Sequence, residues 1–284
     1  MIDLLYQIKA FILGIVEGLT EFLPISSTGH LIIAGDLLNF SGPEVNTFSI
    51  AIQAGAICAV CWFYRERLYR ILTGFTTEKQ QRQLVINLFV AFLPAAVLGV
   101  IFADLIEELL FNPVTVAAAL VIGGFIIFWV ENWQAKQSTA CRTSTMDDMT
   151  AKTAFLVGCM QCIAMIPGTS RSGATIIGGL VLGLSRKAAT EFSFFLAIPT
   201  IFGATVYSLS KVFLRISQEQ TFVWTTNMTV GFAVGFIVSF VSALIVVKWL
   251  LRYVASNDFK PFGWYRIVFG FVILVTHYTG LVQW

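Results

Sequence analysis

Residues 17–30 read EGLTEFLPISSTGH and place two carboxylates and a histidine inside sequence that is otherwise apolar enough for a membrane. Side chains four positions apart share one face of a helix, so Glu17 and Glu21 repel each other unless a cation lies between them. An ionised acid near the bilayer centre costs about 2.5–3.5 kcal/mol on insertion scales. Pro24 ends the helix after the acids, and a hydroxyl-rich loop with His30 follows. This combination favours a functional site over acids that only reach the membrane interface or bond to neighbouring helices.

The composition is that of a polytopic membrane protein. The chain has 284 residues, of which 57% are hydrophobic and 12% charged, and its mean hydropathy is +0.81. The longest polar segment, 134–152, is too short to bury a core of its own. The net charge of +2 is small and gives no sign of nucleic-acid binding. We therefore expect the protein to interact with membrane lipid and not with nucleic acid.

We expect an all-α polytopic membrane protein with six full transmembrane helices and two re-entrant helical hairpins. A hydrocarbon core takes about 20 apolar residues to cross, and the segments of suitable length are 45–64, 84–106, 114–130, 188–209, 222–250 and 262–281. Two further apolar regions, 4–40 and 154–184, are broken by clusters of Pro, Gly, Ser and Thr. Non-helical backbone at membrane depth is tolerated only inside protein or beside a wet cavity. We therefore interpret both regions as hairpins, with residues 24–30 as the first tip and residues 167–175 as the second tip.

The two broken regions resemble each other at a constant offset of 144 residues. Residues 14–57 laid on 158–201 without a gap give eleven identities in 44 positions, clustered on Gly and Ser of the tips. The chain is interpreted as a duplication within one integral membrane domain: 1–135 with hairpin 4–40 and three spans, and 153–284 with hairpin 154–184 and three spans. Three crossings per half invert the second half relative to the first, giving an inverted-topology repeat. The two tips are then expected to meet near the membrane midplane.

The loop charges predict the orientation. In this arrangement most Lys and Arg of the short loops, around 65–82, 136–152, 186–187 and 248–260, fall on one side, which should be cytoplasmic. Both termini are then on the outer face, the first hairpin enters from that face, and the second hairpin enters from the inner face.

The second tip reads PGTSRSGAT and contains Arg171, the one basic residue of an apolar region of about thirty. An arginine there needs an anion, and a helix that resumes after it directs backbone N–H groups and its positive dipole end to the same place. Hydroxyl groups add further donors. This pattern predicts a phosphate cradle, for which the candidate residues are Ser26, Thr28, Ser170, Arg171, Ser172, Gly173 and Thr175.

The two tips carry complementary chemistry. Arginine binds phosphate bidentately, while Glu17 and Glu21 can hold a divalent cation that neutralises charge on phosphate oxygens. The reaction also needs a nucleophile and a proton carrier. Ser26, Ser27 and Thr28 are the possible nucleophiles, with Ser27 as the candidate catalytic residue, and His30 is the candidate proton carrier. Arg171 is the third candidate catalytic residue. Whether serine, histidine or water attacks the phosphorus stays open from sequence.

The motifs resemble those of the bacitracin-resistance family of undecaprenyl-diphosphate phosphatases. They are Glu17-x-x-x-Glu21, Pro24-x-Ser26-Ser27-Thr28-Gly29-His30 and Pro167-Gly168-x-Ser170-Arg171-Ser172-x-x-Thr175, and the resemblance extends to 147–150 and 189–194. It implies an inner-membrane enzyme that removes the terminal phosphate of undecaprenyl diphosphate, which recycles the lipid carrier for peptidoglycan synthesis and lowers sensitivity to bacitracin. It also implies dependence on Mg²⁺ or Ca²⁺ and a site that opens to the periplasm.

Two other functions fit part of the pattern. Inverted repeats with broken helices are also typical of secondary transporters and flippases, which would bind the lipid without hydrolysing it. A phosphatase for shorter prenyl or diacyl diphosphates would share the head-group motifs. The prenyl chain length, the cellular metal and the oligomeric state, with a homodimer among the alternatives, are not encoded in these motifs.

Overall fold

The computed structural model describes residues 3–42, 45–136, 143–218 and 225–282, and for 103–104, 107, 209 and 211–218 it describes the backbone alone. Within these ranges the chain is all-helical. The elements are α1 (Leu4–Thr20), α2 (Ser27–Leu37), α3 (Val45–Phe63), α4 (Arg65–Gly74), α5 (Lys79–Leu110), α6 (Pro113–Lys136), the 3-10 turn η1 (Met146–Asp148), α7 (Ala151–Ile163), α8 (Arg171–Val181), α9 (Arg186–Gln218), α10 (Thr226–Tyr253) and α11 (Lys260–Thr279).

Both predicted helix breaks are present, and they have the same backbone form. Helices α2 and α8 each contain 11 residues and begin 144 positions apart, at Ser27 and Arg171. The residue before each helix is a serine with a positive φ, 69° at Ser26 and 70° at Ser170. Such a backbone is uncommon for a residue other than glycine and costs about 1–3 kcal/mol. Two copies of this strained turn at the offset of the sequence repeat indicate that the backbone, too, is duplicated.

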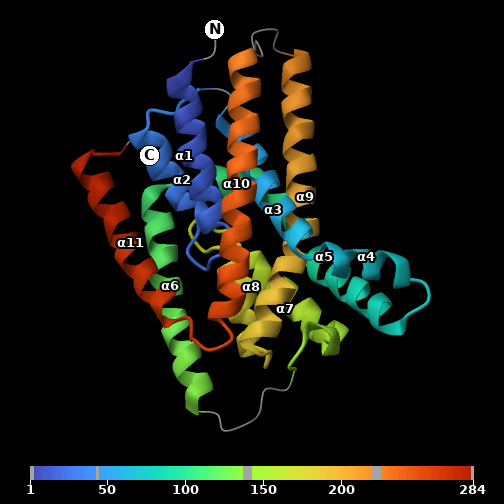
Figure 1. Cartoon of the computed structure of the whole chain (residues 1–284). Helices are drawn as coiled ribbons and strands as arrows, with labels where there is room; N and C mark the ends of the chain where they lie inside the picture. The colour runs from blue at the N-terminus through green and yellow to red at the C-terminus, as the bar shows by residue number, and fades with distance from the viewer. Residues whose placement is uncertain (1–2, 43–44, 137–142, 219–224, 283–284) are drawn as a thin grey trace.

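The two broken pairs approach each other from opposite ends of the molecule. In Figure 1, α1 runs from the upper end to the centre and α2 returns upward, whereas α7 and α8 lie in the lower half. The loops that join each pair meet between them. The hydroxyl of Ser172 in the first turn of α8 donates to the carbonyl of Leu23 at 2.7 Å, so the second half is in direct contact with the loop of the first.

Within the described residues, five helical segments have the length and apolar composition to cross a membrane. They are Val45–Phe63, Lys79–Phe102, Pro113–Lys136, Arg186–Ser208 and Thr226–Tyr253. The sixth predicted span, 262–281, does form the helix α11, but its composition keeps it out of this group, since Arg266 and His277 lower its hydropathy. The protein is therefore polytopic and all-α, and the count of six spans stays a prediction.

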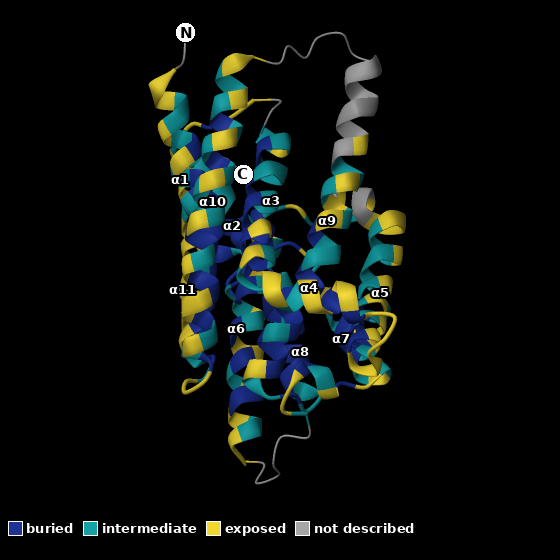
Figure 2. Cartoon of the chain, turned by 45° about the vertical axis from the view of Figure 1, so that its right-hand side comes forward, coloured by how far each residue is buried: buried dark blue, intermediate teal, exposed yellow. Residues whose placement is uncertain are grey.

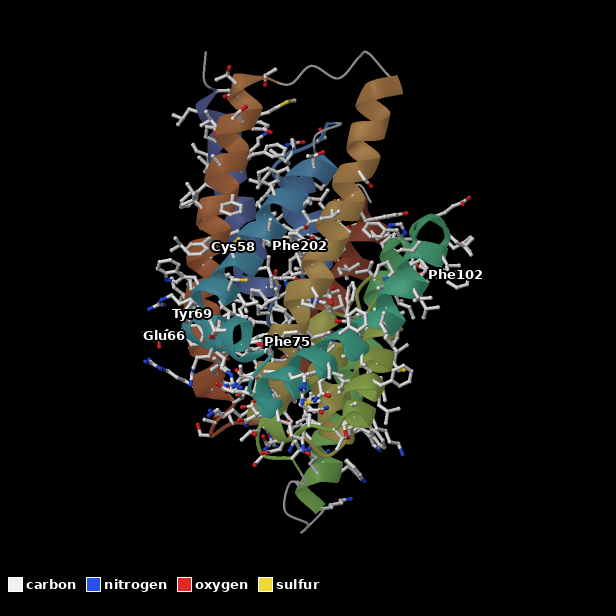
Figure 3. All side chains as sticks on the ribbon, turned by 90° about the vertical axis from the view of Figure 1, so that its right-hand side faces the viewer. Cys58, Glu66, Tyr69, Phe75, Phe102 and Phe202 are labelled. Carbon is white, nitrogen blue, oxygen red and sulfur yellow. The ribbon has the colours of Figure 1, made fainter. Side chains whose placement is uncertain are left out.

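The outer surface is apolar. Exposed residues cover the outside of the helices while buried ones fill the centre (Figure 2). Large side chains such as Tyr69, Phe102 and Phe202 project from the lateral face (Figure 3), with exposed fractions of 69%, 41% and 68%. A belt of this kind is stable against lipid tails and would be a liability in water.

Each broken pair packs against a long helix of the other half of the chain. Helix α1 lies along α10, and α7 lies along α5. A Cβ atom placed on Gly14 of α1 would lie 2.7 Å from the carbonyl oxygen of Gly235, and one on Gly158 of α7 would lie 2.2 Å from that of Ala91. The two contacts are equivalent by the offset of 144, since Gly14 corresponds to Gly158 and Ala91 corresponds to Gly235. Close approach at small residues is a common basis of helix packing in membranes, and here it interlocks the two halves.

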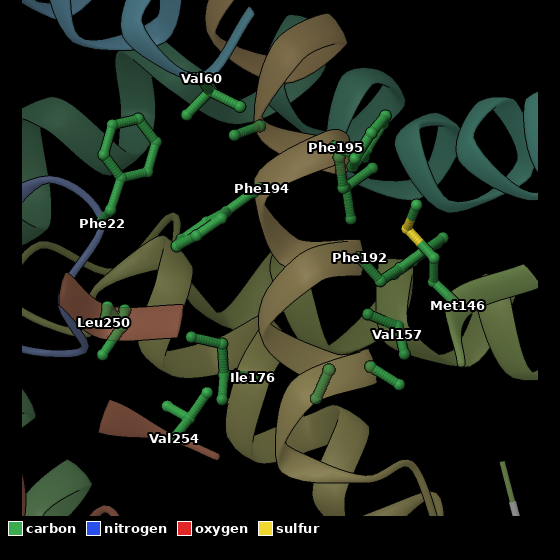
Figure 4. Packing of buried hydrophobic residues seen from close by; sticks show 14 of the residues in the cluster. Phe22, Val60, Met146, Val157, Ile176, Phe192, Phe194, Phe195, Leu250 and Val254 are labelled. Atoms are coloured by element: carbon green, nitrogen blue, oxygen red, sulfur yellow. The ribbon is translucent and has the colours of Figure 1, made fainter. Parts of the chain in front are cut away.

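The hydrophobic core surrounds the meeting point of the tips. Phe22, directly after the two acids, packs edge-on against Phe194 of α9 with a centroid distance of 5.4 Å. Figure 4 shows these rings together with Val60 of α3 and Ile176 of α8, all buried. Elements from both halves therefore fix the position of the acidic segment.

Candidate active site

Glu21 lies where the two halves meet. Its Oε2 accepts a hydrogen bond of 2.5 Å from the hydroxyl of Ser27, and its Oε1 accepts one of 3.1 Å from Nη2 of Arg171. The glutamate and arginine side chains are only 9% and 14% exposed. The two tips therefore lie together, as expected, and the arginine that was predicted to bind phosphate forms an ion pair with one of the two acids in this structure.

The same site contains buried polar atoms of both charges without a partner. Glu17 is completely buried, and neither of its carboxylate oxygens has a hydrogen-bond partner among the described residues. Nη1 of Arg171 is likewise buried and unpartnered within the described part of the chain. A buried polar group left without a partner costs about 1–3 kcal/mol, and more when it is charged. Among the described residues, two carboxylate oxygens of Glu17 and one guanidinium nitrogen of Arg171 therefore lie near Glu21 without a hydrogen-bond partner. Such oxygens suit a cation, and such a nitrogen suits an anion.

The carboxylates fit the predicted divalent cation in chemistry. Glu17 and Glu21 lie one turn apart at the end of α1 and interact electrostatically with each other and with Arg171. Mg²⁺ and Ca²⁺ take carboxylate, phosphate and water oxygens, and Mg²⁺ sites often use only one or two carboxylates. The described residues contain no cluster of three or more His, Cys, Asp or Glu, so an ion at Glu17 and Glu21 would have two acidic ligands from this part of the chain.

The hydroxyl residues of the first tip are not equivalent. Ser27 bonds to Glu21, which is the geometry of a nucleophile beside a base. Ser26 is the strained residue before α2, and its carbonyl accepts from the ring of His30. Thr28 is half-buried in the first turn of α2, one position beyond Ser27. The predicted roles of Ser26 and Thr28 in phosphate binding stay predictions.

His30 is enclosed by α11 rather than by the acids. Its Nδ1 lies 2.7 Å from the carbonyl oxygen of Ser26, and its Nε2 lies 2.6 Å from the hydroxyl of Tyr265. The ring stacks on Phe269 with a centroid distance of 3.9 Å. With Nδ1 donating to a carbonyl, Nε2 is the acceptor for the tyrosine hydroxyl. Both ring nitrogens are engaged, so His30 is held in one orientation, and its catalytic role stays a prediction.

The hydroxyls of the second tip bond within the protein. Ser172 donates to the carbonyl of Leu23, and Ser170 accepts from the N–H of Gly173 at 3.1 Å. Thr175 donates to the carbonyl of Arg171 at 2.9 Å and lies 2.6 Å from the Ser193 hydroxyl. In this structure these groups shape the cradle and tie it to the first tip. Direct phosphate contacts by Ser170, Ser172, Gly173 and Thr175 stay predictions.

Sequence reasoning missed the contribution of α11. Tyr265 and Phe269 enclose His30, and the guanidinium of Arg266 lies between the tips. The signal for Arg266 was visible, because it is a lone arginine in an apolar segment, as Arg171 is. No pattern in the sequence marks Tyr265 or Phe269, since their role depends on how α11 packs.

Comparisons with known proteins identify the family of this chain. Residues 10–272 match the family described as bacitracin resistance protein BacA. The chain is 53% identical over 282 residues to the undecaprenyl-diphosphatase of Janthinobacterium sp. (strain Marseille), covering 99% of both chains. It is 54% identical to the undecaprenyl-diphosphatase of Nitrosomonas europaea, covering 99% of this chain and 98% of that one. The chain belongs to the BacA bacitracin resistance family.

Proposed function

We propose that this protein is a membrane phosphatase that hydrolyses undecaprenyl diphosphate to undecaprenyl phosphate and inorganic phosphate. This reaction would recycle the lipid carrier for peptidoglycan synthesis and lower sensitivity to bacitracin. The observation that carries the proposal is the meeting of the two halves at Glu21, with unpartnered carboxylate oxygens of Glu17 on one side and the unpartnered Nη1 of Arg171 on the other. A diphosphate with a divalent cation supplies partners for all of them.

In the proposed reaction Ser27 is the nucleophile. Its Oγ forms a bond to the terminal phosphorus, the bond from that phosphorus to the bridging oxygen breaks, and undecaprenyl phosphate leaves. The hydroxyl proton moves to Glu21, which already accepts the hydrogen bond of Ser27 at 2.5 Å. Water then attacks the phosphorus of the phosphoserine, and the bond from that phosphorus to Oγ breaks. Glu21 returns its proton to Oγ, and dihydrogen phosphate leaves with both protons of the water. Arg171 binds the transferring phosphoryl group through Nη1 while Nη2 keeps its contact with Glu21.

Glu17 and Glu21 are the proposed ligands of Mg²⁺ or Ca²⁺. A bound divalent cation would neutralise negative charge that develops on the phosphate oxygens. Without it, Glu17 is a buried carboxylate that lacks a hydrogen bond within the described chain, so the site itself favours a cation.

We further propose an inverted-topology repeat, 1–135 and 153–284, with six transmembrane helices and two re-entrant hairpins. The offset of 144 that relates α2 to α8 supports the repeat, and the opposite approach of the two broken pairs supports the inversion (Figure 1). The basic loops would be cytoplasmic, and both termini and the opening of the site periplasmic. A homodimer remains an untested prediction.

The proposal is tested by phosphate release from undecaprenyl diphosphate by the purified protein in detergent, with and without chelator. We expect chelator-sensitive release that Glu21→Gln abolishes and that Glu66→Gln leaves unchanged, since Glu66 is an exposed surface residue with a side chain 85% exposed. Binding of the lipid without phosphate release would instead favour a transporter or flippase. Equal rates with short-chain prenyl diphosphates would broaden the substrate class.

A further inference from the structure

Arg266 is a buried cation whose bonds all go to the main chain. It lies in α11 and is 1% exposed. The guanidinium has five N–H donors, and five main-chain carbonyl oxygens accept from them. Nε donates to the carbonyl of Leu120 at 3.3 Å. Nη1 donates to those of Pro24 at 3.1 Å and Thr169 at 2.8 Å, and Nη2 donates to those of Ala119 at 3.0 Å and Gly168 at 3.1 Å.

Two of these carbonyls occupy equivalent positions in the two tips. Pro24 and Gly168 are related by the offset of 144, so one guanidinium binds the same carbonyl of each half. Both residues lie in non-helical backbone, where carbonyls lack the N–H partners that a helix provides. An unsatisfied carbonyl at membrane depth costs several kcal/mol by transfer scales, about 2–7. A planar fork of donors can satisfy several at once, and a lysine ammonium cannot reproduce that fork.

The neighbouring helix leaves room for this guanidinium. A Cβ atom placed on Gly123 of α6 would lie 2.2 Å from Nη2, which is shorter than any tolerable contact. Residue 123 must therefore be glycine for the guanidinium to reach the tips as it does. Gly99 of α5 provides a matched contrast, because a Cβ there would have no atom within 4 Å.

The charge of Arg266 is not paired with a carboxylate. None of the ion pairs among the described residues includes it. Its Nη1 lies 3.2 Å from the place of a Cβ on Gly173, directly behind the first turn of α8. The positive charge is therefore next to the second tip, and no described carboxylate forms an ion pair with it.

We propose that Arg266 is a positioning residue that sets the two tips against each other, so that Glu21 of one half and Arg171 of the other face the same phosphoryl group. The proposal rests on the proposed phosphatase function for its kinetic consequence, but the positioning itself is independent of it. Arg266 touches the backbone of both tips and has no contact with the side chains of Glu21, Ser27 or Arg171 among the hydrogen bonds of the described residues.

Two substitutions test the proposal from different helices. Arg266→Lys removes the fork, and Gly123→Ala displaces the guanidinium while leaving the arginine in place. Arg252→Lys, at an exposed position of α10, and Gly99→Ala are the matched controls. Each purified variant is examined by amide hydrogen exchange and by steady-state phosphate release per folded protein.

We expect amides in both 21–28 and 164–173 to exchange about tenfold faster or more in Arg266→Lys and Gly123→Ala, while α9 is unchanged. We expect kcat to fall by about tenfold to a hundredfold, since a displacement of about 1 Å at a site can cost a hundredfold, with KM changed by less than about threefold. Both controls should match the native protein.

Unchanged exchange of the two tips in Arg266→Lys would overturn the proposal, whatever happens to kcat, because the residue would then act by charge or not at all. If both test variants fail to fold while both controls fold, Arg266 is a residue of general stability and the proposal is wrong. If the native protein releases no phosphate, the proposed function fails while the exchange measurement still decides the positioning role.

Discussion

Replacing Arg171 by lysine keeps the positive charge of the second tip and removes the fork of the guanidinium. In the structure Nη2 binds Glu21 Oε1 at 3.1 Å, and Nη1 is buried without a partner in the described chain. A single ammonium can take over one of these two positions. If it stays with Glu21, the phosphoryl group loses its contact; if it moves to the phosphoryl group, Glu21 loses its partner.

The expected loss follows from which contact is made in the transition state. An arginine that stabilises a transferring phosphoryl group is worth about 10³–10⁵ in rate. Since lysine keeps the charge, we expect Arg171→Lys to be at least about a hundredfold slower, or about 2.7 kcal/mol at 1.36 kcal/mol per decade. Arg171→Ala is less informative, because removing one partner of a buried ion pair costs about 3–5 kcal/mol in stability.

The assay is initial phosphate release from undecaprenyl diphosphate at saturating Mg²⁺, normalised to the monodisperse fraction on size exclusion. Arg70→Lys, at an exposed position of α4, is the control and should retain native turnover. Near-native turnover of folded Arg171→Lys would refute the reasoning, because Arg171 would then be only the charge partner of Glu21.

Four further outcomes are expected. Glu17→Gln should lower activity and raise the Mg²⁺ concentration needed for half-maximal rate by about tenfold. The same change should raise the unfolding temperature, because it removes a buried carboxylate that has no hydrogen bond within the described chain. Ser27→Ala should reduce phosphate release by at least about 10³ without loss of folded protein, measured as above. Gly18→Ala should lower the yield of monodisperse protein, because its Cβ would lie 2.5 Å from the carbonyl oxygen of Ser239 on α10. In intact cells without other cysteines, Thr279→Cys should react with an impermeant thiol reagent, and Gln80→Cys should react only after lysis.

Matched changes separate these effects from general damage. Glu66→Gln, Ser41→Ala and Gly99→Ala alter exposed or uncrowded positions and should behave as native. An unchanged Mg²⁺ requirement in Glu17→Gln would show that Glu17 is not a metal ligand. Native turnover in Ser27→Ala would show that water, and not Ser27, attacks the phosphorus. Normal folding of Gly18→Ala would show that α1 and α10 can separate, and labelling of position 80 from outside would reverse the orientation.

The sequence was sufficient for the broken helices and for the pairing of charges. The Pro, Gly and Ser clusters interrupt helical backbone by local chemistry, and the offset of 144 placed the start of α8 relative to that of α2. A lone Arg171 and a pair of acids in apolar sequence need partners, and the sequence pointed to phosphate for the arginine and to a cation for the acids. In the structure Arg171 and Glu21 also contact each other directly, at 3.1 Å.

What the sequence could not supply depends on tertiary packing. The stacking of Phe269 and the bond from Tyr265 to His30 arise because α11 reaches the first tip, and no spacing rule encodes that approach. The hydroxyls of Ser172 and Thr175 suit a phosphate as well as a carbonyl, and only the structure shows that carbonyls accept from them here. The hydropathy of α11 is lowered by Arg266, so the residue that makes this helix a poor span also makes it important for the tips.

The interlocking of the two halves has a consequence for the order of synthesis. Helix α7 leaves the ribosome after its partner α5, so the second hairpin can dock as soon as it is made. Helix α1 ends at Thr20, whereas its partner α10 begins at Thr226, which takes about 10–40 s longer to translate at about 5–20 residues per second. During that interval α1 has its contacts with α2 and α3, but Gly14 and Gly18 lack α10, against which they pack. A chain truncated before α10 is therefore expected to leave this face of α1 uncovered.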